Sequence, residues 1–205
     1  MNEYPDLSLG YEALSFAYLQ SGSNEKAVEI ILRALPKFPE EVTFPYSLAT
    51  IFYKTGDYLK AENYYYSTLA IKPDMVSVKH ALAIMYEEME DIKRSDSLFL
   101  HMIQQDENDA VGHNDYAYIL SEREQSSPDD LHFALNLAKN AISIEPDNAA
   151  FLDTIGWIYF KLGTYRKAKE FIEKSLSIND NNPVILEHLG DIYLKLNKST
   201  EAVNI

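Results

Sequence analysis

A period of 34 residues is the feature that most limits what this chain can fold into. Gly156 and Gly190 are 34 residues apart, and so are Tyr159 and Tyr193. The same frame runs back to the start of the chain and places repeats near residues 8, 42, 76, 110, 149 and 183, with one irregular step of 39 residues after 110. A period of this length indicates a stack of similar supersecondary units rather than one irregular core.

Each repeat is expected to form two helices. Apolar residues recur at intervals of three and four from Leu152 to Leu162 and again from Ala168 to Leu176. Gly163 lies between the two runs and suits a left-handed turn at a helix end. Prolines three residues before a repeat start end the second helix at Pro39, Pro73 and Pro146. The pattern therefore predicts an all-α fold of antiparallel helices of about 14 residues each, without a sheet.

Small side chains recur at one position of each predicted helix. On the first helices they are Ser15, Ala49, Ala83, Ala117, Gly156 and Gly190, and on the second helices Ala27, Ala61, Ser95, Ala134, Ala168 and Ala202. A small residue at both positions lets two helix backbones approach closely. Because a single pair cannot bury its apolar face alone, neighbouring pairs must stack.

This pattern resembles the tetratricopeptide repeat family from Ser8 to Ile205, and it is closest to bacterial members. The strongest copy runs from Leu152 to Asp180. The resemblance implies a right-handed superhelical solenoid whose first helices line a concave groove that holds partner proteins. Glu107 and Asp180 stand where the family has proline.

Residues 1–205 are expected to form a single repeat array that is a fragment of a longer protein. Residues 2–6 look like the tail of a preceding repeat, and the last repeat stops early. Ala202, Val203 and Ile205 then lack a following repeat to cover them, which predicts self-association through uncapped ends. A polar insertion over 121–126 precedes Ser127, a predicted helix cap, and is either a partner-contacting loop or a tolerated surface insertion.

Charge and cysteine content exclude several classes of function. The chain has 32 acidic and 18 basic residues, so its net charge is −14. Such a charge disfavours nucleic acid as a partner, and no apolar stretch is long enough for insertion into a membrane. With no cysteine, thiolate catalysis and disulfides are ruled out. The compartment stays open between a bacterial cytoplasm and a periplasm or cell envelope.

No residue pattern indicates an enzyme. None of the five histidines pairs with another at the spacing of metal ligands, and the seven glycines form no phosphate-binding loop. We therefore expect no catalytic residue, no cofactor and no metal site.

The candidate partner-binding groove is formed by residues that the family geometry turns toward the concave face. These are Glu12, Phe16, Tyr46, Thr50, Tyr53, His80, Ile84, Asn114, Tyr118, Asp153, Trp157, Phe160, Glu187 and Asp191. No Lys or Arg stands at the positions where chaperone-binding relatives clamp a carboxylate. The mixture of acidic and aromatic residues predicts a basic, partly apolar protein or peptide as partner.

Two alternatives stay open at this stage. Trp157 is either exposed in the groove or buried between helices, whereas Tyr46, Tyr53 and Tyr118 are expected to keep their hydroxyls in water. The chain is either a non-catalytic scaffold that binds a partner in its groove or a structural spacer that acts by self-association. A groove filled by the chain's own side chains would favour the spacer.

Overall fold

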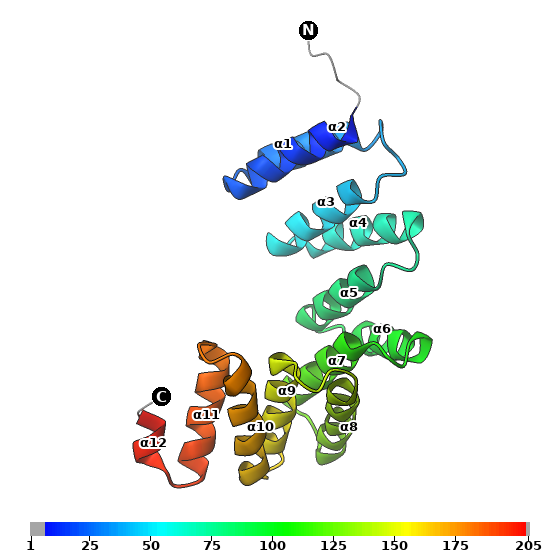
Figure 1. Cartoon of the computed structure of the whole chain (residues 1–205). Helices are drawn as coiled ribbons and strands as arrows, with labels where there is room; N and C mark the ends of the chain where they lie inside the picture. The colour runs from blue at the N-terminus through cyan, green and yellow to red at the C-terminus, as the bar shows by residue number, and fades with distance from the viewer. Residues whose placement is uncertain (1–6, 204–205) are drawn as a thin grey trace. The chain divides into compact units, whose positions relative to one another are not determined.

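The computed structural model describes residues 7–203, and over this range every regular element is a helix (Figure 1). The helices are α1 (Ser8–Gln20), α2 (Asn24–Ala34), α3 (Thr43–Lys54), α4 (Tyr58–Ile71), α5 (Val76–Glu88), α6 (Ile92–Gln105), α7 (Ala110–Glu122), α8 (Pro128–Ile144), α9 (Ala149–Lys161), α10 (Tyr165–Ile178), α11 (Pro183–Lys195) and α12 (Ser199–Val203). The all-α fold class expected from the sequence is confirmed. Five of the six predicted repeat starts are the first residue of a helix, and α3 begins one residue later.

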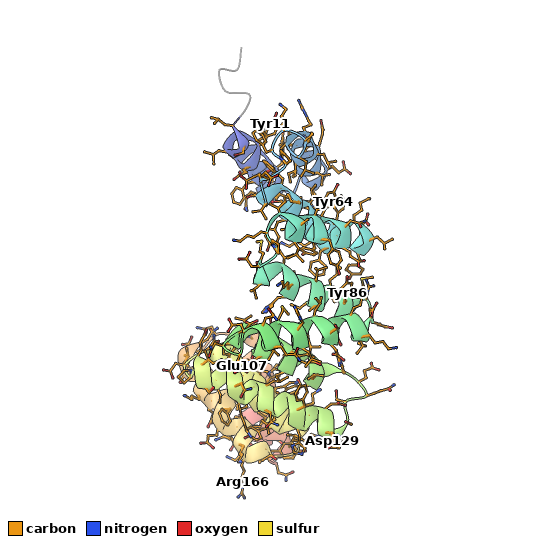
Figure 2. The ribbon with its side chains drawn as sticks, turned by 90° about the vertical axis from the view of Figure 1, so that its right-hand side faces the viewer. Tyr11, Tyr64, Tyr86, Glu107, Asp129 and Arg166 are labelled. Atoms are coloured by element: carbon orange, nitrogen blue, oxygen red, sulfur yellow. The ribbon has the colours of Figure 1, made fainter. Side chains whose placement is uncertain are left out.

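The helices group into two compact units whose boundary lies within α6, between Leu98 and Phe99. In both units an odd-numbered helix packs against the even-numbered helix that follows it, as α3 does with α4 and α9 with α10. Aromatic side chains fill the spaces between helices. Phe52 stacks on Tyr64 in the first unit, and Tyr159 stacks on Phe171 in the second; Figure 2 labels Tyr64 among the side chains.

The repeated small residues lie where the helices pack most closely. Ala49 and Ala61 in the first unit, and Ala117 and Ala134 in the second, have no exposed surface. Gly156 is the tightest position, because a Cβ atom built on it would lie 2.7 Å from Cδ1 of Ile172. At Gly190 the same atom would meet nothing within 4 Å. The repeat position is therefore small throughout, but the space around it differs.

The turn between paired helices uses one left-handed residue. Gly22, Gly56 and Gly163 have φ angles of 73°, 79° and 72°, as the sequence predicted for Gly163. Glu90 and Asn197 adopt φ of 59° at the equivalent place in their repeats. The turn geometry is thus kept where the glycine is missing.

The insertion before α8 ends in a complete helix cap. The Ser127 side chain accepts a hydrogen bond from the backbone N–H of Asp130, while the Asp130 carboxylate accepts one from the backbone N–H of Ser127. These bonds satisfy otherwise unpaired groups at the helix end and hold the pKa of Asp130 below its usual value. The predicted cap at Ser127 is confirmed.

The two chain ends expected to mediate self-association are only partly described. Ala202 is half-buried in α12. The Val203 side chain, Ile205 and residues 2–6 lie outside the described residues, so the expectations placed on them stay predictions.

Candidate functional site

An open groove runs between α1 and α3 in the first unit, and we call it the α1/α3 groove. It consists of two adjoining cavities of about 490 and 310 Å³ that share Phe16, Leu19 and Ser47 in their walls. Tyr46 and Thr50 line the larger cavity, and Glu12 lines the smaller. All of these except Leu19 and Ser47 are among the predicted groove residues, so the repeat frame brings them together as expected.

Phe16 is the most exposed aromatic side chain in this groove. It keeps 61% of its surface accessible, although it lies between two cavities. Leu9, which also lines the smaller cavity, is 69% exposed. The remaining walls are mostly polar: Gln20, Asn24 and Lys54 border the larger cavity. The groove therefore has an apolar floor open to solvent and a polar border, which is the usual composition of a protein-binding surface.

The next part of the predicted groove, on α3 and α5, is partly closed by the chain itself. The Tyr53 hydroxyl donates a hydrogen bond of 2.6 Å to Glu88, and the Tyr58 hydroxyl donates one of 3.1 Å to the same carboxylate. Burial and this carboxylate raise the pKa of Tyr53. His80 is buried, and Ile84 is half-buried. This stretch offers a partner less free surface than α1.

In the second unit the predicted groove residues pack against one another instead of lining an opening. Trp157 is only 9% exposed, because its ring stacks between those of Phe160 and His188 at centroid distances of 4.8 and 4.0 Å. Its Nε1 donates a 2.6 Å hydrogen bond to Glu122, which also contacts Nζ of Lys161 at 3.1 Å. We call this arrangement the Trp157 stack.

Asp153 is buried beneath the Trp157 stack. One of its carboxylate oxygens lies 2.8 Å from Nδ1 of His188. Asn114 is buried as well, and its side-chain oxygen has no hydrogen-bond partner among the described residues. Asp153, Asn114 and Trp157 had been expected to present polar or aromatic surface to a partner. The structure shows them, together with His80 in the first unit, as buried side chains.

Three predicted groove residues of the second unit do reach solvent. Tyr118 is 39% exposed, and burial and then the nearby carboxylates of Glu122 and Asp153 raise its pKa. Glu187 is exposed and Asp191 is half-buried on α11. They are scattered positions rather than the walls of a cavity.

Sequence reasoning missed the residues that close the face of the second unit. Glu122, His188 and Lys161 were not among the candidates, although each contacts Trp157 or Asp153. A signal was present: Tyr53–Glu88, Glu122–Trp157 and Asp153–His188 are all separated by 35 residues. Side chains one repeat plus one residue apart therefore meet across neighbouring first helices.

Neither unit contains a cluster suited to catalysis or to metal binding. Within residues 7–203 no three His, Cys, Asp or Glu side chains lie close enough to hold a metal ion. No helix in this range combines the length and the apolar composition that crossing a membrane requires.

Comparison with known proteins supports the repeat assignment. Residues 149–182 match the family model of the tetratricopeptide repeat. A TPR repeat-containing protein of Methanocaldococcus jannaschii is 24% identical over 175 residues, which are 83% of this chain and 30% of that protein. The chain thus spans less than a third of the length of this relative.

Solved structures agree with the fold. A TPR protein of Thermus thermophilus superposes with a TM-score of 0.67 at 20% identity, covering 80% of this chain and 87% of that one. A tetratricopeptide repeat protein of Parabacteroides merdae superposes with a TM-score of 0.74 at 15% identity, covering 96% and 77%. Both come from bacteria, in line with the resemblance noted in the sequence. The chain has the fold of tetratricopeptide repeat proteins, which are generally non-catalytic scaffolds for protein–protein interaction.

Proposed function

We propose that this tetratricopeptide repeat chain is a non-catalytic scaffold that holds a segment of a partner protein in the α1/α3 groove. The observation that carries the proposal is the exposure of Phe16, 61%, between two connected cavities. A large aromatic side chain that remains accessible inside a concave surface is a favourable anchor, because covering it removes apolar area from water.

The partner segment is apolar where it meets Phe16 and Leu19 and carries basic residues nearby. Glu12 lines the smaller cavity, and the net charge of −14 attracts cations over a longer range. The acidic contribution expected from Asp153 is absent from this proposal, because that carboxylate is buried against His188. Binding is therefore expected to weaken moderately with salt rather than to depend wholly on charge.

The second unit supports the alternative function, a structural spacer, for its own part of the chain. Its predicted groove face is filled by the Trp157 stack, and this is the condition under which a spacer role is favoured. The two functions are compatible, since one unit can present the groove while the other extends the array.

The test is a selection of displayed random peptides on the immobilised chain, followed by affinity measurements on variants. Phe16→Ser is expected to weaken a selected peptide about tenfold or more, because truncating a buried aromatic anchor costs about 2 kcal/mol. Leu59→Ser is the matched control, since Leu59 is 71% exposed on α4 and lines neither cavity.

Equal losses for the two variants would contradict binding in the α1/α3 groove. Weak selection of any peptide by the wild-type chain, combined with concentration-dependent sedimentation, would favour the spacer.

A further inference from the structure

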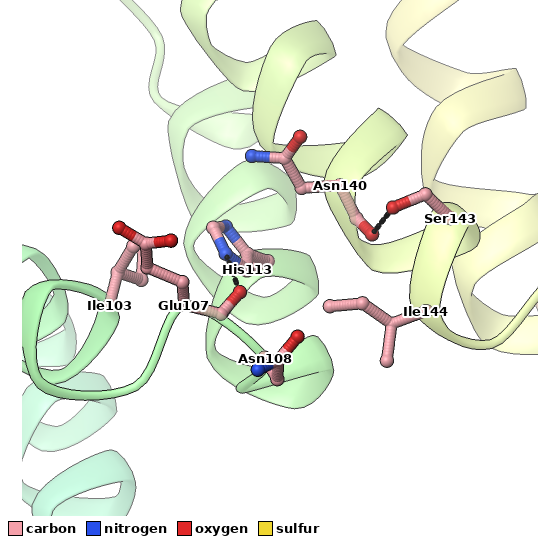
Figure 3. A pocket seen from close by; sticks show the side chains of 7 residues that line it. All are labelled: Ile103, Glu107, Asn108, His113, Asn140, Ser143 and Ile144. Carbon is pink, nitrogen blue, oxygen red and sulfur yellow. Dashed lines mark hydrogen bonds between the residues drawn. The ribbon is translucent and has the colours of Figure 1, made fainter.

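A polar cavity in the second unit lies apart from every residue assigned to the groove. Its volume is about 410 Å³. Figure 3 shows it from close by, with polar walls from Glu107, Asn108, His113, Asn140 and Ser143 and two isoleucines completing the lining. The residues come from the last turns of α6 and α8 and from the first turn of α7. We call it the His113 pocket.

His113 provides an acceptor that the chain leaves unused. The side chain is only 3% exposed, and its Nε2 lies 3.1 Å from the backbone oxygen of Glu107. A carbonyl oxygen can only accept, so Nε2 carries the proton and the Nδ1 of the neutral ring is an acceptor. This Nδ1 is buried and has no hydrogen-bond partner among the described residues. An unpaired buried acceptor is costly, so a donor that reaches it would be bound favourably.

The other walls of the pocket also favour positive charge. The C-terminal end of a helix carries partial negative charge, and neither α6 nor α8 has a basic residue in its last turn. The opposite dipole end, at the start of α7, is already capped by Asp109, which accepts a bond from the backbone N–H of Gly112. Glu107 adds an exposed carboxylate. Ser143 donates its hydroxyl proton to the backbone oxygen of Asn140 and so presents only lone pairs.

We propose that the His113 pocket binds the guanidinium group of an arginine side chain supplied by a protein partner. A guanidinium offers several coplanar N–H donors, which suits acceptors spread over Glu107, His113 and Asn108 better than a compact ammonium does. The volume exceeds what a bare ion requires, and no three metal-ligating side chains gather within residues 7–203. The protein source of the arginine rests on the proposed scaffold function, whereas the site itself does not.

The test uses a single arginine side chain as probe, so that it is independent of the α1/α3 groove. The isotopically labelled chain is titrated with N-acetyl-arginine methylamide and, in parallel, with the citrulline analogue, which has nearly the same shape without the charge. The arginine probe is expected to shift the His113 ring nitrogens and the Asn108 and Asn140 side-chain amides. The citrulline probe is expected to bind markedly more weakly.

A charge-neutralising pair of variants completes the test. Glu107→Gln is expected to weaken the arginine probe about two- to fivefold, the range for a solvent-exposed ion pair. Glu124→Gln removes the same charge from an exposed position of the second unit outside the pocket and is expected to leave binding unchanged.

Equal binding of the two probes, or equal effects of the two variants, would overturn the site. Shifts confined to α1 and α3 would also overturn it, since they would place the arginine in the groove. Failure of peptide binding in the groove, by contrast, would leave the arginine shifts at His113 in place.

Discussion

Phe16 and Trp157 occupy the same position of their repeats, yet one is open and the other is enclosed. Phe16 keeps 61% of its surface accessible beside the cavities of the α1/α3 groove, whereas Trp157 keeps 9% within the Trp157 stack. The difference does not arise from the backbone, because both lie on a first helix of regular length. It arises from the neighbours: His188, Phe160 and Glu122 cover the indole of Trp157. Repeat position thus sets the direction of a side chain, and the adjacent repeats decide whether it is available.

The largest expected effect comes from truncating these two aromatics. Trp157→Ala removes a buried ring and the hydrogen bond to Glu122, so the free energy of unfolding is expected to fall by about 3–5 kcal/mol. Phe16→Ala removes a ring that contacts mainly solvent and is expected to change it by less than about 0.5 kcal/mol. Urea unfolding followed by circular dichroism measures both, and similar losses would remove the distinction between open and enclosed positions.

A second comparison uses the glycines that share one repeat position. Gly156→Leu forces side-chain atoms into Ile172 and is expected to lower the free energy of unfolding by about 1–3 kcal/mol. Gly190→Ala meets no atom within 4 Å, and it is expected to stabilise the helix by about 0.5–1 kcal/mol. Thermal melts that shift in the same direction for both variants would show that the two sites are equally crowded.

A third comparison concerns two acids at equivalent positions, Asp153 and Glu187. Asp153→Ala leaves Nδ1 of the buried His188 without its partner and is expected to cost about 1–3 kcal/mol. Glu187→Ala alters an exposed position and is expected to cost less than about 0.5 kcal/mol. Denaturant midpoints of the two variants measure this difference. If Asp153→Ala were as stable as Glu187→Ala, the buried pair would have no structural role.

The sequence predicted the helices well because their cause is local. Apolar spacing, small residues and turn glycines act within one repeat, and they place the helix starts to within one residue. The Ser127 cap was equally readable, since a capping box needs only four consecutive residues.

The availability of the candidate site could be predicted only in part. The frame correctly grouped Glu12, Phe16, Tyr46 and Thr50, because all four point to one side of α1 and α3. It could not foresee that Glu122 and His188 would close the equivalent face around Trp157, because that closure depends on side-chain pairing between repeats. The His113 pocket escaped sequence reasoning for a related reason: it forms where the ends of α6 and α8 meet the loop before α7, outside the repeat's regular positions.

The most direct test of the central claim follows the chain's two faces in one spectrum. The chain has a single tryptophan, so the indole N–H signal of Trp157 reports on the enclosed face, while the backbone amides of α1 and α3 report on the groove. On addition of a peptide selected against the chain, we expect the α1 and α3 amides to shift and the indole signal to stay in place. A shifted indole signal with unchanged α1 and α3 amides would contradict the account, because it would place the partner on the face that the chain fills with its own side chains.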